Sequence, residues 1–335
     1  MENQASNVSI IEVANKIMSE VMEYRRVPKS GHICDDVNCQ KCSSYHMPKI
    51  LEAIENNEAI SFVLPAFPGK SPNPEKVLGE LPDHAERLSL QFLGSLCESI
   101  KTYYTPGIKI ILCSDGRVFS DVVGIKESNV TAYQLELDRL ISEMNLSDIS
   151  TFNLDDVYED FNFVQMREEV MKRFGQSLDF VKHKIKKGAD ENSSAEEQEA
   201  NRMYCGITRF LFEDATHSEQ TKSRSSVQKE SRAKAYEVIR RSNAWSELIE
   251  ERFPEAVRLS IHPQVCGSKK LGIRLIGNES WMTPWHGVAV EVKDKFVLLK
   301  KSEAEALGAE LIHSTNGRPS HYKLASEQIL IMAEV

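Results

Sequence analysis

The sequence predicts an α/β fold, with a Rossmann-like sheet, helices on both faces and a helical and loop cover. Two apolar runs of strand length, at residues 59–64 and 108–113, flank a stretch with Leu88, Phe92 and Leu96 at helical spacing. A strand, a helix and a second strand in this order form a βαβ unit, in which the two strands run parallel. The ends of both runs are followed by loops rich in polar residues, and open α/β sheets bind their ligands at such ends.

The remaining elements follow from the same spacing. Apolar residues at helical intervals predict further helices at 9–27 and 47–57, from Ser128 to about Met144, within 152–187 and at 236–253. Apolar runs predict strands at 257–261, 271–276, 286–292 and 295–299, the last two forming a hairpin around Lys293. The polar stretch 186–201 has no apolar period and is expected to be a mobile loop. We expect a segment of residues 1–50, with a helix and a cysteine-rich stretch, before a single α/β domain at 51–335 with a mainly helical insertion at about 150–250.

Composition restricts the class of protein. The chain of 335 residues has 50 acidic and 41 basic residues and a formal charge of -9, which argues against a general nucleic-acid surface. Its first residues lack the features of a signal peptide, and no run approaches the ~18 apolar residues of a membrane helix. Seven cysteines, an odd number, favour reduced thiols over a disulfide framework. We therefore expect a cytoplasmic protein with no nucleic-acid or membrane partner.

The stretch "LPAFPGKSPNPEKVLGELPDHAE" is a long, proline-rich loop after the first predicted strand. Strand-to-helix connections usually have ~2–6 residues, and longer ones in compact domains are typically functional or disordered. Because proline fixes its own φ and restrains the preceding residue, the loop can hold Lys70, Ser71 and Asn73 in place for a phosphate or a carboxylate. A rigid surface crossover with solvated charges is the alternative.

The second loop, "CSDGRVFSDVVG", leaves the next predicted strand. Arg117 could bind an anion through two hydrogen bonds, while Asp115 and Asp121 could bind an amine or sugar hydroxyls. A β-turn with an exposed arginine is the alternative. Two histidines near predicted strands, His262 and His286, could transfer protons near neutral pH, although each could instead be structural.

Basic residues are concentrated between residues 208 and 234 of this acidic chain, including Arg209, Lys222 and Arg224. A phosphorylated small molecule would explain two or three fixed cations, and a solvated helical face is the alternative. Walker, dinucleotide-binding, zinc-protease and serine-hydrolase motifs are absent from the sequence.

Three cysteines near the N-terminus, Cys34, Cys39 and Cys42, are accompanied by His32 and His46. These groups are sufficient for a tetrahedral zinc site, but the spacing lacks the second CxxC pair of a strong zinc motif. The interpretation favoured by the sequence is buried or incidental thiols, so no metal ligand is assigned.

Four blocks together resemble the isocyanide (isonitrile) synthase family, which includes the pyoverdine/paerucumarin-cluster enzyme and the yeast spore-wall dityrosine protein. They are "FVLPAFPGKSPNPEKVLGELPDHAE", "SDGRVFSDVVGI", "YEVIRRSNAWSELI" and "VRLSIHPQ" with "KKLGIRLI", within about residues 55–300. The resemblance implies a Rossmann-like enzyme that converts the α-amine of an aromatic L-amino acid, tyrosine or tryptophan, into an isocyanide. The carbon would come from the ketone carbon of ribulose 5-phosphate, without a cofactor.

The resemblance also implies roles for the residues named above. Lys70 and Ser71, with Lys222 and Arg224, would hold the sugar phosphate, and Arg117 would hold a carboxylate. Proton transfer would fall to Asp115, Asp121 and His262, with Lys70 also in the catalytic set. The other substrate-binding candidates are Asn73, Asp83, Glu86, Arg209 and His286, of which Asp83 and Glu86 would orient Lys70 or sugar hydroxyls.

An iron-dependent oxygenase is expected to act downstream on the isocyanide. Two other functions stay open at this point: another phosphosugar-binding lyase or isomerase, and a non-catalytic metal sensor built on the cysteine cluster.

Overall fold

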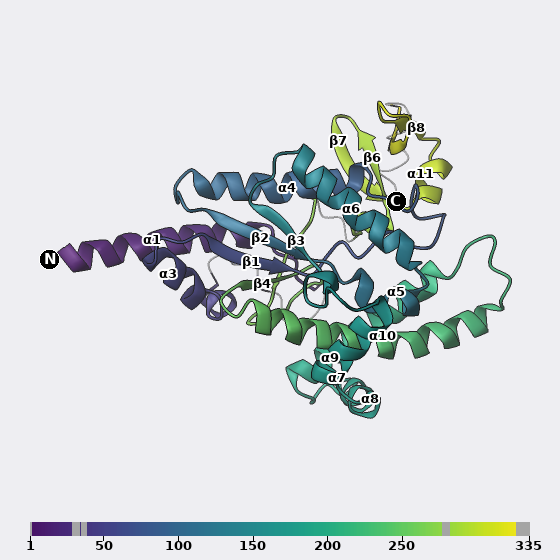
Figure 1. The fold of residues 1–335 in the computed structure, drawn as a ribbon, viewed down its shortest axis with the longest axis horizontal. Helices are drawn as coiled ribbons and strands as arrows, with labels where there is room; N and C mark the ends of the chain where they lie inside the picture. Colours follow the sequence, from purple (N-terminus) through teal and green to yellow (C-terminus); the bar gives the residue numbers. More distant parts are fainter. Residues whose placement is uncertain (1, 29–33, 35–38, 277–281, 326–335) are drawn as a thin grey trace.

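A five-stranded parallel sheet forms the centre of the molecule in the computed structural model, which describes residues 2–28, 34, 39–276 and 282–325 (Figure 1). Its strands are β1 (Ile60–Leu64), β2 (Ile108–Cys113), β3 (Ile149–Phe152), β4 (Val257–Ser260) and β5 (Leu271–Gly272), in the order β3-β2-β1-β4-β5. This is the strand order of a Rossmann-like sheet. From β1 the chain adds strands first on one side, as β2 and β3, and then on the other, as β4 and β5, so the order reverses between β1 and β4. The predicted fold class and the βαβ unit are confirmed.

Helices cover both faces of this sheet (Figure 1). Alternate residues of a strand point to opposite faces, so Phe62 and Leu64 enter one core while Val63 enters the other. The first core is completed by α1 (Glu2–Glu23), α3 (Met47–Glu55), α4 (His84–Lys101) and α6 (Glu127–Glu143). The second is completed by α5 (Gly116–Val123), α7 (Phe163–Phe174) and α10 (Arg224–Arg252). Fully buried Trp245 of α10 anchors this second layer.

Between α7 and α10 the chain forms α8 (Leu178–Lys187) and α9 (Ala195–Asp214), which pack against α10. The prediction of a mobile loop over 186–201 is therefore wrong for its second half. Ser194 caps α9, and a reciprocal hydrogen bond from Glu197 completes a capping box. Such a Ser-x-x-Glu pattern is a helix-start signal that the polar composition obscured. Among the helices of the described residues, none is long and apolar enough to cross a membrane.

A second, four-stranded sheet follows the first. It contains β6 (Val288–Val292), β7 (Lys295–Leu299), β8 (Glu310–His313) and β9 (Pro319–Lys323), in the order β7-β6-β9-β8, with α11 (Lys301–Ala306) after β7. The predicted β6–β7 hairpin is confirmed, and Lys293 and Asp294 at its turn both have positive φ. The sheet packs against the first turns of α4 through Ala289 and Leu298.

Several short elements differ from the prediction. Strands β3, β8 and β9 were not predicted, and the run 271–276 forms only the two-residue β5 followed by an isolated bridge between Ile273 and Arg25. That bridge joins the N-terminal segment to the edge of the main sheet. The short helical elements are α2 (Gln40–Ser43) and two 3₁₀ turns, η1 (Leu154–Asp156) and η2 (Pro284–His286).

Candidate functional site

Polar loops follow three neighbouring strands at the carboxyl edge of the main sheet. The proline-rich loop 65–83 leaves β1, Ser114 and Asp115 follow β2, and His262 follows β4. The strands β2 and β4 lie on either side of β1. The loops therefore surround the point where strand order reverses, which is the usual ligand position in open α/β sheets.

The proline-rich loop is fixed to the rest of the molecule. The Ser114 hydroxyl donates to the Phe67 carbonyl at 2.8 Å, and Phe67 itself has a positive φ of 58°. A Cβ atom at Gly116 would lie 1.9 Å from the Pro68 carbonyl oxygen, so only glycine permits this close approach of the two loops. A buried, anchored loop is the opposite of a solvated linker.

One buried cluster, the Lys70 centre, consists of Lys70, Asp83 and Glu86. The Lys70 ammonium lies 2.8 Å from an Asp83 carboxylate oxygen and 2.7 Å from Glu86, and it also donates to the Pro284 carbonyl at 3.1 Å. Asp83 and Glu86 form the capping box of α4, and the Tyr133 hydroxyl donates to Glu86 at 3.1 Å. Burial raises the pKa of Glu86 to about 7, although Lys70 opposes this shift. All three ammonium protons of Lys70 have acceptors within the chain.

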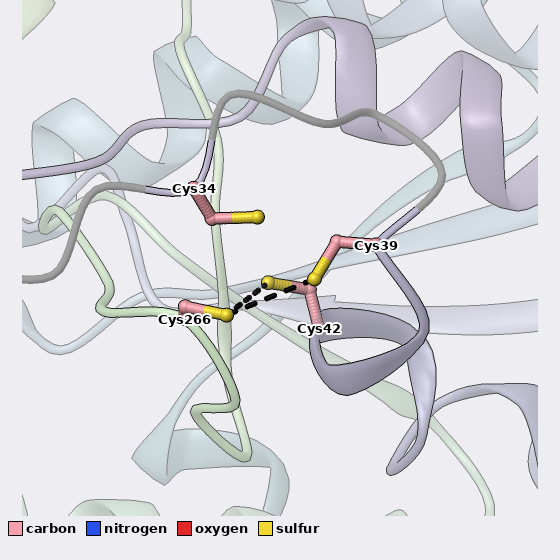
Figure 2. A group of neighbouring side chains, drawn as sticks. All are labelled: Cys34, Cys39, Cys42 and Cys266. Atoms are coloured by element: carbon pink, nitrogen blue, oxygen red, sulfur yellow. Dashed lines mark hydrogen bonds between the residues drawn. The ribbon is translucent and has the colours of Figure 1, made fainter.

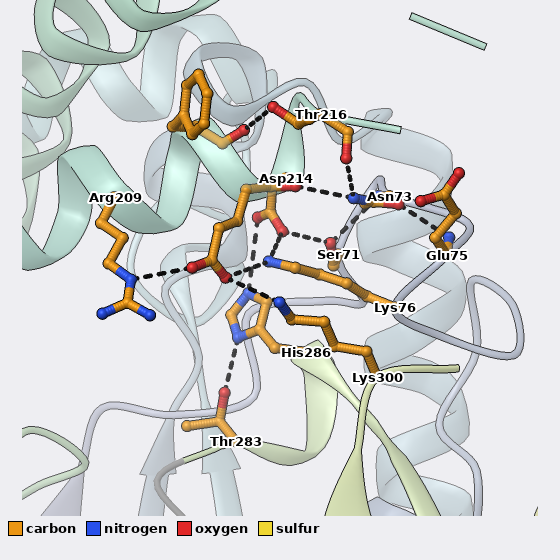
Figure 3. A network of polar contacts seen from close by, with 12 residues as sticks. Ser71, Asn73, Glu75, Lys76, Arg209, Asp214, Thr216, Thr283, His286 and Lys300 are labelled. Atoms are coloured by element: carbon orange, nitrogen blue, oxygen red, sulfur yellow. Dashed lines mark hydrogen bonds and ion pairs between the residues drawn. The ribbon is translucent and has the colours of Figure 1, made fainter. Parts of the chain in front are cut away.

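A second cluster, the Asp214 centre, consists of Ser71, Lys76, Asp214 and His286 (Figure 3). The last residue of α9, Asp214, accepts hydrogen bonds from the Lys76 ammonium at 2.6 Å and the Ser71 hydroxyl at 2.7 Å. His286 Nε2 lies 3.8 Å from the other carboxylate oxygen, and its Nδ1 is 2.7 Å from the Thr283 hydroxyl. Three distant segments of the sequence thus meet at one carboxylate: the proline-rich loop, the end of α9 and the turn that holds His286.

Burial shapes the charges of the Asp214 centre. Desolvation raises the pKa of Asp214, while Lys76 acts in the opposite direction. Desolvation, followed by repulsion from Lys76 and Lys70, lowers the pKa of His286 well below its usual value. His286 is therefore neutral near pH 7, so one ring nitrogen can accept a proton.

A cavity of about 230 Å³ lies against this centre. Asp214 lines it together with His217, Lys222 and Lys234, and apolar residues such as Leu211 complete the wall. The exposed Lys222 also pairs with Glu230, with 2.7 Å between the charged atoms. Glu230 lines the cavity as well, so its wall carries two carboxylates beside the ammonium groups of Lys222 and Lys234, which we call the cationic rim. A lining of this mixed kind suits a polar ligand with an anionic group.

Asp115, at the end of β2, is a second buried acid near this edge. Its Oδ1 atom is buried and makes no hydrogen bond within the described part of the chain. Desolvation raises the pKa of Asp115 to about 7, against the opposing charge of Arg258. A carboxyl group of this pKa can donate or accept a proton near neutral pH. His262 lies at the end of β4 with an exposed side chain.

Other candidates from the sequence have partners elsewhere. The Arg117 guanidinium is bound by Asp155 and lies 3.1 Å from the Thr131 hydroxyl. Asp121 is on α5, with its side chain 43% exposed, and pairs with Arg241 at 2.7 Å. The exposed Arg209 pairs with Glu213 within α9. Their roles toward a substrate stay predictions.

Asn73 and Arg224 also have identifiable contacts. The Asn73 amide donates to the carbonyls of Glu213 at 2.8 Å and Thr216 at 3.1 Å, which ties the proline-rich loop to the end of α9. The Arg224 guanidinium lies 5.5 Å from the centre of the Phe212 ring. Asn73 therefore fixes the geometry of the Asp214 centre from outside it.

Sequence reasoning missed Lys76, Asp214 and Thr283. Lys76 stands in the proline-rich loop already singled out, and Asp214 stands in the basic stretch 208–234. No local motif links them, because 138 positions separate the two residues. Only the packing of α9 against the loop brings them together.

The three N-terminal cysteines considered as possible metal ligands lie close together, and a fourth cysteine from a distant part of the sequence lies with them. Cys34, Cys39 and Cys42 lie together with Cys266 (Figure 2). His46 is buried, and its Nε2 makes no hydrogen bond within the described residues. His32 lies outside the described residues.

Comparison with known proteins gives consistent matches. The family model described as pyoverdine/dityrosine biosynthesis protein matches residues 50–312. An L-tryptophan isonitrile synthase from Fischerella ambigua is 44% identical over 92% of this chain and 91% of its own length. An L-tyrosine isonitrile synthase from Xenorhabdus nematophila is 44% identical over 95% of this chain and 93% of its own. The crystal structure of the PvcA protein from Pseudomonas aeruginosa aligns with a TM-score of 0.86 and 41% identity, covering 93% of this chain and 100% of that chain.

Proposed function

The chain belongs to the pyoverdine/dityrosine biosynthesis family and is an isocyanide synthase, and on this premise we propose that its substrates are an aromatic L-amino acid, tyrosine or tryptophan, and ribulose 5-phosphate. The relatives named above act on tryptophan and tyrosine, which supports an aromatic amino acid. The carbon donor is proposed from the chemistry of the site.

The observation that carries the proposal is the cavity beside the Asp214 centre. Lys222 and Lys234 line the cavity, and His217 adds a third nitrogen base. A phosphate needs two or three such donors rather than a broad basic surface. The buried Asp214 also lines the cavity and accepts a hydrogen bond from Ser71, and these two groups suit the hydroxyl groups of a sugar. A phosphosugar therefore fits with its phosphate at the cationic rim and its carbon chain toward the centre.

The first chemical step would join the two substrates. The amino acid must lose a proton from its ammonium group before its nitrogen can attack the ketone carbon. We assign the removal of this proton to neutral His286. We assign Asp115 as the acid: it protonates the ketone oxygen as the nitrogen attacks, regains a proton that the nitrogen then releases, and protonates the resulting hydroxyl so that it leaves as water. Asp214 positions Lys76 and His286 for this step. Carbon–carbon cleavage then removes the remaining sugar carbons, and none of these steps requires a redox cofactor.

Other roles expected from the sequence belong to the same proposal. Arg117 as a carboxylate ligand, and Asp121 and His262 in proton transfer, are tested by the activities of the respective variants. Lys70 as a phosphate ligand would require it to exchange an acceptor, since Asp83, Glu86 and Pro284 now occupy its donors. Processing of the isocyanide by an iron-dependent oxygenase would follow.

The direct test is turnover with labelled ribulose 5-phosphate. The protein is incubated with tyrosine or tryptophan and with ribulose 5-phosphate carrying ¹³C at the ketone carbon. The expected product absorbs in the infrared as an isocyanide, and its isocyanide carbon carries the label. An unlabelled isocyanide would overturn the proposed donor. Consumption of ribulose 5-phosphate without any isocyanide would instead favour a phosphosugar lyase or isomerase.

A further inference from the structure

Four cysteine sulfurs meet on the side of the molecule where the N-terminal segment joins the main sheet (Figure 2). Cys34 follows α1, Cys39 and Cys42 flank the start of α2, and Cys266 lies between β4 and β5. Their sulfurs all lie within 4.8 Å of one another. We call these four residues the cysteine cluster.

The spacing of the sulfurs distinguishes a metal site from a disulfide. Cys266 Sγ lies 3.7 Å from Cys39 Sγ and 3.5 Å from Cys42 Sγ. A disulfide requires about 2.05 Å, and the described cysteines form none. A zinc ion with bonds of about 2.3 Å to four sulfurs separates them by about 3.8 Å in a regular tetrahedron. The cluster therefore already has nearly the size of a zinc tetrathiolate.

The backbone holds the cysteines of the cluster in tight turns. At the first turn of α2 the N–H groups of Cys42 and Ser43 both donate to the Cys39 carbonyl, at 3.0 and 3.1 Å. Gly267 has a φ of +80°, in a turn closed by a hydrogen bond of 3.1 Å from Ser268 N–H to the Val265 carbonyl. This left-handed conformation favours glycine, and it turns the chain directly after Cys266.

Charge compensation is present as well. A zinc ion with four thiolates carries a net charge of −2, which is costly to bury without a nearby cation. Arg25 lies beside the cluster, with Nη1 3.5 Å from Cys34 Sγ and a hydrogen bond to the Cys34 carbonyl. The guanidinium thus supports one ligand and lowers the cost of the charge.

We propose that Cys34, Cys39, Cys42 and Cys266 bind one zinc ion as a closed structural site. This replaces the interpretation from the sequence, in which the thiols were incidental and a histidine was the available fourth ligand. Cys266 was missed because 224 positions separate it from Cys42. Four protein ligands leave no position for a substrate, so the ion is structural rather than catalytic.

The site would clamp the N-terminal segment to the β4–β5 loop. Gln264 N–H of this loop donates to the Arg26 carbonyl at 2.9 Å, and Arg26 N–H donates to the Gly272 carbonyl of β5 at 2.8 Å. His262 stands four positions before Cys266 in this loop. The metal therefore fixes a loop at the carboxyl edge of the sheet, independently of which amino acid the enzyme uses.

The test is the metal content and coordination of the full chain. The protein is purified from zinc-supplemented cells without chelators and analysed by elemental mass spectrometry and zinc X-ray absorption. We expect one zinc per chain and four sulfur neighbours at about 2.3 Å. Replacement by Co²⁺ should give the intense visible bands of a tetrahedral thiolate site. Both measurements use the unmodified chain, so they do not depend on a variant that folds.

Cysteine variants provide the matched comparison. Cys266→Ser should lose nearly all bound zinc, whereas Cys205→Ser, which changes an exposed cysteine outside the cluster, should retain one zinc per chain. Folded protein with less than a tenth of an equivalent of zinc would overturn the proposal. So would iron as the bound metal, nitrogen or oxygen neighbours in the absorption spectrum, or a disulfide within the cluster of freshly reduced protein.

Discussion

Two lysines of the same proline-rich loop, Lys70 and Lys76, are each only 3% exposed but have different surroundings. Lys70 binds two carboxylates that lie 13 and 16 positions further along the chain, and these carboxylates also cap α4. Lys76 binds Asp214, which is 138 positions away at the end of another helix and borders a cavity. The Lys70 centre is closed, whereas the Asp214 centre is open to a ligand.

The contrast teaches that burial alone does not identify a functional charge. A buried ammonium group with three acceptors has all its hydrogen bonds made within the chain. Its removal lowers the free energy of unfolding, because the remaining carboxylates are then buried without a cation. A buried carboxylate in the wall of a cavity can interact directly with a ligand that binds in the cavity. The first arrangement should therefore govern stability and the second activity. Four experiments separate these two outcomes.

The largest effect is expected for Asp214→Asn. The amide keeps the size of the side chain but removes the charge that positions Lys76 and His286, so kcat/KM should fall about 10²–10⁴-fold. Steady-state kinetics with the isocyanide assay measures this. The neighbouring Glu213→Gln is the matched control and should stay within a few-fold of the original activity. Equal losses in both variants would contradict a specific role for Asp214.

Lys70→Met should mainly lower stability. It leaves Asp83 and Glu86 buried without their cation, which should cost about 3–5 kcal/mol of unfolding free energy. Urea unfolding at pH 7.5 measures the change, with Lys109→Met as a control at an exposed lysine. A variant of unchanged stability and lost turnover would instead give Lys70 the catalytic role expected from the sequence.

Glu86→Gln should change how stability depends on pH. Because the folded pKa of Glu86 is raised to about 7 from 4.5, the folded state holds a proton that the unfolded state has released between these values. This group's contribution is fully present below about pH 4.5 and is lost as the pH rises through 7. Relative to the variant, the original chain should lose roughly 1–3 kcal/mol between pH 5 and 8.

Unfolding in urea at both pH values tests this difference. Glu98→Gln changes an exposed glutamate of the same helix and should leave the pH dependence unaltered. The idea fails if Glu86→Gln and the original chain show parallel stability curves.

The smallest effect is expected at the cationic rim. Lys222→Gln removes an exposed charge, and such charges contribute up to about 1 kcal/mol, so KM for ribulose 5-phosphate should rise about 2–5-fold. The exposed Lys229, on α10 shortly after Lys222 but outside the cavity lining, provides the control as Lys229→Gln. A rise in the KM of the amino acid alone would place the phosphate elsewhere.

The main sheet could be predicted because its strongest signals are local. Phe62 and Ile110 belong to apolar runs on either side of an amphipathic helix, and periodicity alone orders these elements. Strands such as β3, with four residues, gain their conformation from pairing with β2 rather than from their own sequence. The start of α9 had a local signal in Ser194 and Glu197, which the surrounding polar residues hid.

The position of the candidate site in the fold could be predicted from the sequence, but the full set of residues that form it could not. Loops at the ends of predicted parallel strands had to converge, which placed Lys70, Asp115 and His262 at one edge. The sequence could not reveal that Lys70 is saturated by the α4 capping box, because this depends on where the helix begins in space. It also could not pair Lys76 with Asp214, or Cys42 with Cys266, since the connecting chain folds into several helices first.

The cysteine cluster also sets an order of events during synthesis. Cys39 and Cys266 are 227 positions apart, so at about 5–20 residues per second the ribosome needs roughly 10–45 s to add Cys266 after Cys39. During that interval three thiols wait without their partner. The N-terminal segment can therefore be fastened only after most of the sheet has been made, and its correct closure depends on a cell that keeps nascent thiols reduced.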